Sequence, residues 1–131
     1  MHYADTSALV KLVVPEPESS ALRQWLHGSH IELVTSSIVR TELLRATRRG
    51  DVDAGAMARA RDVLARLVIV DVTTEVLDTA GVLDPVEVRS LDAVHLATAL
   101  ILGDEIETVI TYDARMAQAA AALGLAISAP A

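Results

Sequence analysis

The chain of 131 residues is most simply one domain, residues 1–131, and its 52% hydrophobic content without any Phe predicts an aliphatic core. Cysteine is absent, which excludes disulfides, thiolate metal ligands and cysteine nucleophiles. No basic leader precedes an apolar stretch and no run is long enough to cross a bilayer, so we expect a cytoplasmic protein without membrane contact. The last few residues are expected to form a frayed tail.

The net charge of −7 argues against a general nucleic-acid binder, because such proteins usually present a basic face. Residues 40–66 depart from this average, since they hold seven arginines and only four acidic residues. Helices rich in arginine beside an acidic centre could hold a phosphate backbone. The alternative is that most of these arginines lie on solvated faces and pair with acidic residues one turn away.

Short apolar runs alternate along the chain with amphipathic stretches of helical period. The predicted strands cover residues 3–5, 31–35, 68–72, 108–112 and 125–128. The predicted helices cover residues 8–13, 18–26, 54–67, 91–102 and 114–123, together with one helix that runs to residue 49 and one that starts at residue 73 or 74. The predicted N-caps are Ser36 or Ser37 for the helix that runs to 49, Asp53 for 54–67 and Ser90 for 91–102. This alternation predicts an α/β fold whose parallel sheet has crossover helices on both faces.

Four separate segments each carry one acidic residue at a strand end or near the start of a helix, where α/β folds gather ligand-binding groups. They are HYADTSALVKL with Asp5, SSIVRTELLRA with Glu42, SLDAVHLATAL with Asp92 and TVITYDARMAQAA with Asp113. Four carboxylates brought together repel one another unless they are protonated or bridged by cations. The pattern therefore favours a magnesium or manganese site that cleaves phosphodiesters.

Local structure offers another explanation for three of these four residues. Asp5 and Asp113 are good helix caps, and Asp92 lies in a first helical turn, where the helix dipole favours an anion. Glu42 lies beside the apolar stripe of its helix, where a charge is costly unless it is paired or metal-bound. Arg45, three residues later, is a possible structural partner for Glu42.

His95 follows Asp92 by one turn but falls on an apolar helical stripe, so we interpret it as a buried histidine that supports the site and bonds to backbone. His2, His27 and His30 share no motif with it and are expected at the surface. Trp25, between Leu22 and Leu26, is most simply a packing residue. With so few aromatic residues the chain lacks a platform for stacking bases, so substrate choice would depend on RNA shape and backbone contacts.

The four segments, in this order and in a chain of this size, resemble the PIN domain, specifically the VapC-type toxins of bacterial toxin–antitoxin pairs. The resemblance runs from Tyr3 to about Ile127. It implies a five-stranded parallel sheet of order 3-2-1-4-5 and a Mg²⁺-dependent endoribonuclease in which Mn²⁺ can substitute. It also implies a homodimer silenced by a cognate VapB-type antitoxin.

The resemblance also assigns roles to residues. Asp5, Asp92 and Asp113 would bind the metal, Glu42 would do so through a water, and all four would be catalytic. Thr6, Ser7, Thr111 and His95 would support these ligands. Arg40 and Arg45 are the candidates for RNA backbone contacts, and Trp25 for the groove that receives the antitoxin.

Two other acidic α/β families do not fit the residues. A phosphorelay receiver needs a lysine after its last strand, but the only lysine is Lys11. A haloacid-dehalogenase-type phosphatase needs a second aspartate where Ser7 stands. One alternative stays open, a non-catalytic module that binds metal for structure and works through a protein partner.

Overall fold

The computed structural model describes residues 1–50 and 53–131. The elements follow in the order β1 (His2–Ala4), α1 (Thr6–Val13), α2 (Ser19–Gly28), β2 (Leu33–Ser36), α3 (Val39–Arg49), α4 (Ala56–Arg66), β3 (Val68–Val70), α5 (Thr74–Gly81), α6 (Ser90–Leu102), the short 3-10 helix η1 (Gly103–Glu105), β4 (Val109–Ile110), α7 (Ala114–Ala122) and β5 (Ile127–Ser128).

The five strands in the described part of the chain form one parallel sheet of order β3-β2-β1-β4-β5. The central strand, β1, pairs with β2 on one side, where Tyr3 lies opposite Val34, and with β4 on the other, where Tyr3 lies opposite Val109. This arrangement confirms the predicted α/β class, strand order and parallel pairing.

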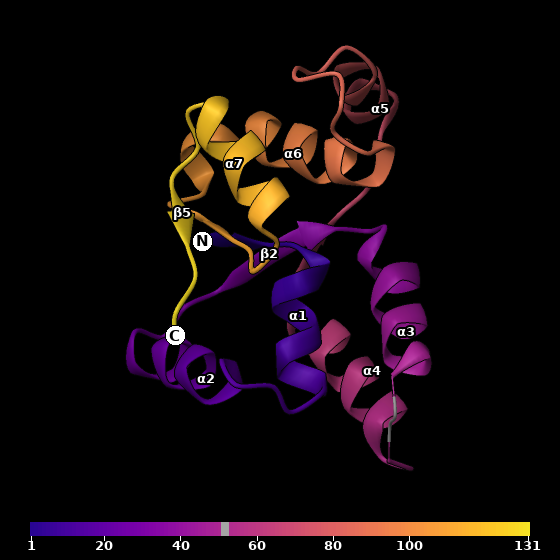
Figure 1. Ribbon diagram of the computed structural model, residues 1–131, viewed down its shortest axis with the longest axis vertical. Helices are drawn as coiled ribbons and strands as arrows, with labels where there is room; N and C mark the ends of the chain where they lie inside the picture. The colour runs from indigo at the N-terminus through magenta and orange to yellow at the C-terminus, as the bar shows by residue number, and fades with distance from the viewer. Residues whose placement is uncertain (51–52) are drawn as a thin grey trace.

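Successive side chains of the strands point to opposite faces of the sheet and pack into different apolar clusters. Ala4 and Ile110 belong to the cluster formed with α1, α2, α3 and α4, whereas Tyr3 and Val109 belong to the cluster that includes Ala99 of α6. Figure 1 shows this division, with α1 to α4 below the sheet and α5 to α7 above it. The helices therefore cover both faces, as predicted.

The carboxylates of Asp5 and Asp113 cap helices, as the local explanation predicts. Asp5 accepts from the backbone N–H of Ala8 at the start of α1, and Asp113 accepts from those of Arg115 and Met116 at the start of α7. These caps fix both aspartates at the carboxyl ends of β1 and β4.

The predicted serine caps of α3 and α6 are wrong. The residue that precedes α3 is Ile38, and the residue that precedes α6 is Arg89, with Ser90 as the first helical residue. The hydroxyl of Ser37 instead accepts from the backbone N–H of Val72, and so joins the start of α3 to the segment after β3.

The segment after β5 is held by a side-chain hydrogen bond, in which the Tyr112 hydroxyl donates to the Pro130 carbonyl oxygen at 2.6 Å. No helix in the described residues is both long enough and apolar enough to cross a membrane.

Candidate active site

All four predicted acidic residues line one small cavity at the carboxyl-end edge of the sheet. The cavity has a volume of about 170 Å³ and is lined by Asp5, Thr6, Ser7, Glu42, Arg89, Asp92, His95 and Asp113. Parallel strands bring their carboxyl ends to one edge, which explains how residues so far apart in the sequence meet there.

Asp5 is the most buried of the four, with only 4% of its surface exposed. Its Oδ1 accepts from the Ser7 hydroxyl at 2.6 Å and from the Ala8 backbone N–H at 3.0 Å, and its Oδ2 accepts from the Thr111 hydroxyl at 2.5 Å. Burial raises the pKa of Asp5 above its ordinary value, and outweighs the opposite effects of these three hydrogen bonds and of His95. The carboxylate is thus fixed in position but is costly to ionise.

The hydroxyls of Ser7 and Thr111 also connect the ends of β1 and β4. Ser7 Oγ accepts from the Tyr112 backbone N–H at 2.9 Å, and Thr111 Oγ1 accepts from the Asp113 backbone N–H at 3.1 Å. Because the same hydroxyls donate to Asp5, they hold it in register with the segment that carries Asp113.

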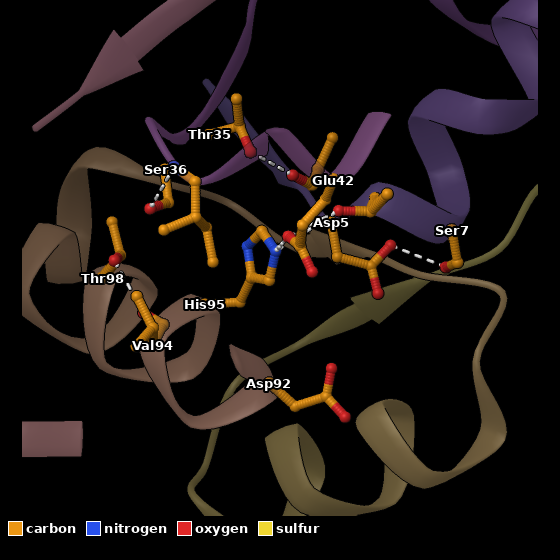
Figure 2. A network of polar contacts seen from close by, with 12 residues as sticks. Asp5, Ser7, Thr35, Ser36, Glu42, Asp92, Val94, His95 and Thr98 are labelled. Atoms are coloured by element: carbon orange, nitrogen blue, oxygen red, sulfur yellow. Dashed lines mark hydrogen bonds and ion pairs between the residues drawn. The ribbon is translucent and has the colours of Figure 1, made fainter. Parts of the chain in front are cut away.

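Glu42 reaches the cavity from α3 and is held by two side chains from other elements. Its Oε1 lies 2.7 Å from His95 Nε2 and accepts from the Thr6 hydroxyl at 2.8 Å. Figure 2 shows the Glu42 carboxylate against the His95 ring, close to Asp5, with Asp92 set apart at the start of α6.

The His95 ring is almost fully buried, at 2% exposure, and its other nitrogen meets the Tyr3 hydroxyl at 2.6 Å. An ionised carboxylate can only accept, so Nε2 of His95 must carry the proton that it shares with Glu42. Burial raises the pKa of the Tyr3 hydroxyl, which therefore stays protonated and can donate to Nδ1. The result is a chain of polar contacts from the core to the cavity.

Partial burial acts to raise the pKa of Glu42, but the hydrogen bonds from His95 and Thr6 outweigh it and leave the pKa lowered. The pKa values of Asp5 and Glu42 are therefore shifted in opposite directions, and Glu42 is ionised at neutral pH.

Asp92 and Asp113 have 20% and 31% of their side-chain surface exposed, and Glu42 is as exposed as Asp92, at 21%. We call Asp92 and Asp113 the outer half of the cavity because they share an exposed partner, and Asp5 and Glu42 the inner half because they contact the buried core. The guanidinium of Arg89 joins them, since Nε donates to Asp92 Oδ2 at 2.9 Å and an NH2 nitrogen donates to Asp113 Oδ2 at 3.2 Å. Arg89 was not among the predicted site residues. Its position three residues before Asp92 could have indicated an ion pair between the two. Its contact with Asp113 depends on the fold and could not be read from the sequence.

The donor set fits a hard divalent cation that keeps much of its water. Carboxylate and hydroxyl oxygens line the cavity, and Mg²⁺ in proteins is commonly held by one or two carboxylates together with several waters. Across residues 1–50 and 53–131, however, no three acidic or histidine side chains are already close enough together to hold an ion. The oxygen ligands are of the right chemical type, but in this structure they are too far apart to hold an ion together.

The other predicted residues lie elsewhere. Arg40 and Arg45 are exposed on α3, and neither lines the cavity. Trp25, on α2, packs against the apolar cluster of α1 to α4, with its ring edge-on to His2 at 4.9 Å between centroids.

Two expectations from the sequence are wrong for a shared reason, namely the possible pairing of Glu42 with Arg45 and the surface position of His2. Glu42 pairs with His95, and no ion pair with Arg45 occurs in the described part of the chain. His2, expected at the surface, is 8% exposed and lies 2.8 Å from the Thr108 hydroxyl. Sequence spacing suggests partners within one helix, whereas these partners come from distant segments. For the same reason His95 bonds to side chains rather than to backbone.

Comparison with known proteins identifies relatives over nearly the whole chain. The family model described as the PIN domain matches residues 3–122. Ribonuclease VapC46 of Mycobacterium tuberculosis is 48% identical over 130 residues, which cover 98% of this chain and 96% of that protein. Ribonuclease VapC35 of the same species is 41% identical over 133 residues, which cover 99% and 97%.

Solved structures share the fold at lower identity. M. tuberculosis VapC20, described as a toxin that cleaves the sarcin–ricin loop, superposes with a TM-score of 0.73 at 20% identity and covers 99% of this chain and all of its own. VapBC2 of Rickettsia felis, solved with a DNA fragment from its promoter, gives a TM-score of 0.71 at 18% identity over the full length of both chains. Because the family model matches most of the chain and the ribonuclease relatives match it over nearly their whole length, the chain belongs to the PIN-domain family.

Proposed function

We propose that this protein is a metal-dependent endoribonuclease and the toxin of a toxin–antitoxin pair. The observation that carries the proposal is the convergence of Asp5, Glu42, Asp92 and Asp113, from four separate segments, on one cavity. Relatives named ribonucleases, at up to 48% identity, support this choice among the chemistries that such a cavity permits.

In this proposal Asp5, Asp92 and Asp113 hold Mg²⁺ or Mn²⁺, and Glu42 does so through a water. The bound ion would supply a Lewis acid that lowers the pKa of a water and offsets charge on the phosphate. The lowered pKa of Glu42 keeps it negatively charged at neutral pH, which suits it to accept a hydrogen bond from a metal-bound water.

The remaining residues position the carboxylates. Ser7 and Thr111 hold Asp5 by its two oxygens, and Thr6 and His95 hold Glu42. Arg40 and Arg45 are proposed to contact the RNA backbone, because they are exposed on the helix that carries Glu42.

The central test is RNA cleavage by the purified protein with Mn²⁺, compared with the Asp5→Asn variant. We expect a loss on the order of 10³-fold, because a metal ion stabilises transition-state charge by several kcal/mol. Asp78→Asn, which changes an exposed aspartate on α5, is the matched control and should cleave normally.

A second measurement, thermal unfolding with and without Mn²⁺, tests the metal site that both candidate functions share, and RNA cleavage then separates the two. The nuclease and the non-catalytic module both predict a stabilisation by Mn²⁺ that Asp5→Asn removes. Stabilisation without any RNA cleavage would favour the module, whereas no stabilisation would refute the metal site itself.

The proposed partner is a VapB-type antitoxin in the cytoplasm, bound where α1, α2 and α4 surround a hollow with both apolar and polar lining residues. This hollow has a volume of about 540 Å³ and is lined by Leu12, Arg23, Leu26, His27, His30, Ile31, Glu32, Leu33, Val63, Arg66 and Leu67. Trp25 does not line it but packs beside it on α2. Solved toxin–antitoxin complexes with this fold support a partner of this kind. The proposed homodimer has a candidate surface in the exposed Val82 and Val86, at 83% and 82% exposure.

The partner assignment is tested with the protein encoded by the adjacent gene. We expect a tight complex that does not cleave RNA, and we expect Trp25→Ala to weaken the complex by more than it lowers the free energy of unfolding in urea. Leu77→Ala removes an exposed leucine from α5 and is the control. A neighbouring protein that does not bind would remove the toxin assignment and leave the nuclease assignment intact.

A further inference from the structure

Arg89 stands in a position that helix electrostatics disfavours. It is the residue immediately before α6, and the N-terminal end of a helix carries partial positive charge, which favours anions and not cations. Its backbone is extended, with φ −63° and ψ 150°, and its carbonyl oxygen accepts from the Ala93 backbone N–H at 2.8 Å, but its side chain does not cap the helix. The helix end therefore does not explain why an arginine stands there, and the local ion pair with Asp92, three residues later, does not account for the contact with Asp113.

The carboxylates of the cavity do explain it. Among the eight described residues that line the cavity, four carry carboxylates and Arg89 alone is an arginine or lysine. Its guanidinium donates to Asp92 and to Asp113, which come from different elements and would otherwise repel each other. An arginine stays charged at any working pH, so this cation is permanently present.

The contacts of Arg89 are of a kind that is easily exchanged. Each carboxylate receives one hydrogen bond from Arg89, so neither pair has the two parallel bonds of the strongest arginine–carboxylate contacts. The Arg89 side chain is 64% exposed, and exposed pairs contribute little to stability because water competes for both partners. By contrast, Asp5 and Glu42 are held by buried or partly buried groups of the core.

We infer that Arg89 is a tethered counter-ion of the candidate metal site, which a divalent cation must displace from Asp92 and Asp113, so that Arg89 sets the metal affinity. This inference rests on the metal site proposed above. It accounts for the absence, across the described residues, of any three side chains already arranged to hold an ion, since two of the three proposed ligands are engaged by the arginine. The metal ion takes the place of the guanidinium. In both states a cation offsets the repulsion between the carboxylates.

The experiment compares Arg89→Gln, Arg89→Lys and the wild type in two measurements. Mn²⁺ affinity is measured by titration calorimetry at low ionic strength, and thermal unfolding is followed in chelator and in excess Mn²⁺. Arg115→Gln is the matched control, because Arg115 lies beside Arg89 in a neighbouring hollow and its loss changes the net charge equally. In the described residues its side chain makes no ion pair with Asp92 or Asp113.

We expect Arg89→Gln to bind Mn²⁺ about fivefold more tightly than the wild type, which is the effect of removing two exposed ion pairs. We expect its melting temperature in chelator to fall by about 2 °C and its gain on adding Mn²⁺ to be larger than that of the wild type. Arg89→Lys keeps the charge and loses the planar fork, so its affinity should lie between the two. The difference between wild type and Arg89→Gln should shrink in high salt.

Equal Mn²⁺ affinity in the wild type, Arg89→Gln and Arg115→Gln would overturn the inference and leave the metal site standing. An equal increase in Arg89→Gln and Arg115→Gln would also overturn it, because a general charge effect would then suffice. Absence of Mn²⁺ binding in both the wild type and Arg89→Gln would refute the metal site and the inference together. Binding by Arg89→Gln alone would support the inference in its strongest form.

Discussion

The two halves of the cavity hold their carboxylates by different means. On the inner side Asp5 and Glu42 receive hydrogen bonds from hydroxyls, a backbone N–H and the buried His95 ring. On the outer side Asp113 also caps α7 through two backbone N–H groups, but Asp92 and Asp113 are joined by the exposed guanidinium of Arg89. The inner partners are fixed by the sheet and the packing of α6, whereas the outer partner is a long side chain with freedom to leave.

Because of this difference, one half of the site is expected to contribute to stability and the other half to rearrange easily. A buried polar group is costly to leave without a hydrogen-bond partner, so the inner half is expected to be rigid and to contribute to the stability of the fold. Exposed ion pairs contribute little and respond to salt, so the outer half can be rearranged at low cost. Each of the following predictions tests one side of this comparison.

The largest effect is expected for His95→Ala. The change leaves the Tyr3 hydroxyl without its buried partner, removes a charge-assisted bond to Glu42 and opens a cavity under α6, so we expect a loss of about 2–4 kcal/mol in the free energy of unfolding. Urea unfolding measures this loss. His27→Ala, at an exposed position on α2, is the control and should change stability by less than about 0.5 kcal/mol. A loss no larger than the control would show that the inner half is not rigidly coupled to the core.

A smaller effect is expected from pH in the metal-free protein. The folded-state pKa of Asp5 is raised above 3.8, so the folded state holds this proton more tightly than the unfolded chain. Stability from Asp5 is therefore present at low pH and is lost as pH rises from about the ordinary value through the folded pKa, by at most about 1.4 kcal/mol per pH unit. Asp5→Asn should remove this loss and so be more stable than the wild type at neutral pH.

Glu42 should behave in the opposite way. Its folded-state pKa lies below the ordinary value of 4.5, so the stability it contributes is present above that value and is lost as pH falls through the folded pKa. Urea unfolding of the wild type, Asp5→Asn and Glu42→Gln over roughly pH 3 to pH 8 measures both effects. Parallel curves for the wild type and Asp5→Asn would contradict the assigned burial cost of Asp5.

The smallest effect is expected for Asp92→Asn in the absence of metal. Arg89 loses one of its two partners, and because the pair is exposed we expect a change within about 1 kcal/mol that disappears at about 1 M salt. The same urea measurement in low and high salt tests this. A loss as large as that of His95→Ala would show that the two halves do not differ in the way described.

Much of the fold was predictable from the sequence because its signals are local. Apolar runs and helical periodicity place the strands and helices, and parallel strands then bring Asp5 and Asp113 to one edge. The sequence could not show the partners that hold the carboxylates. Glu42 meets His95, and Arg89 meets Asp113, only after β1, α3, α6 and α7 have packed together. The roles assigned to the site residues in metal binding and catalysis stay predictions.

The order of strands in the sheet also has a consequence for the growing chain. The central strand β1 is made first, but its neighbour β4 and the cap of α7 come near the end of the sequence. Until β4 is in place, Asp5 lacks the hydroxyl of Thr111, and the cavity lacks Asp113. Since synthesis proceeds from the N-terminus at about 5–20 residues per second, a partly made chain cannot assemble the four carboxylates. The four carboxylates can therefore come together only after the segment that carries Asp113 has been made.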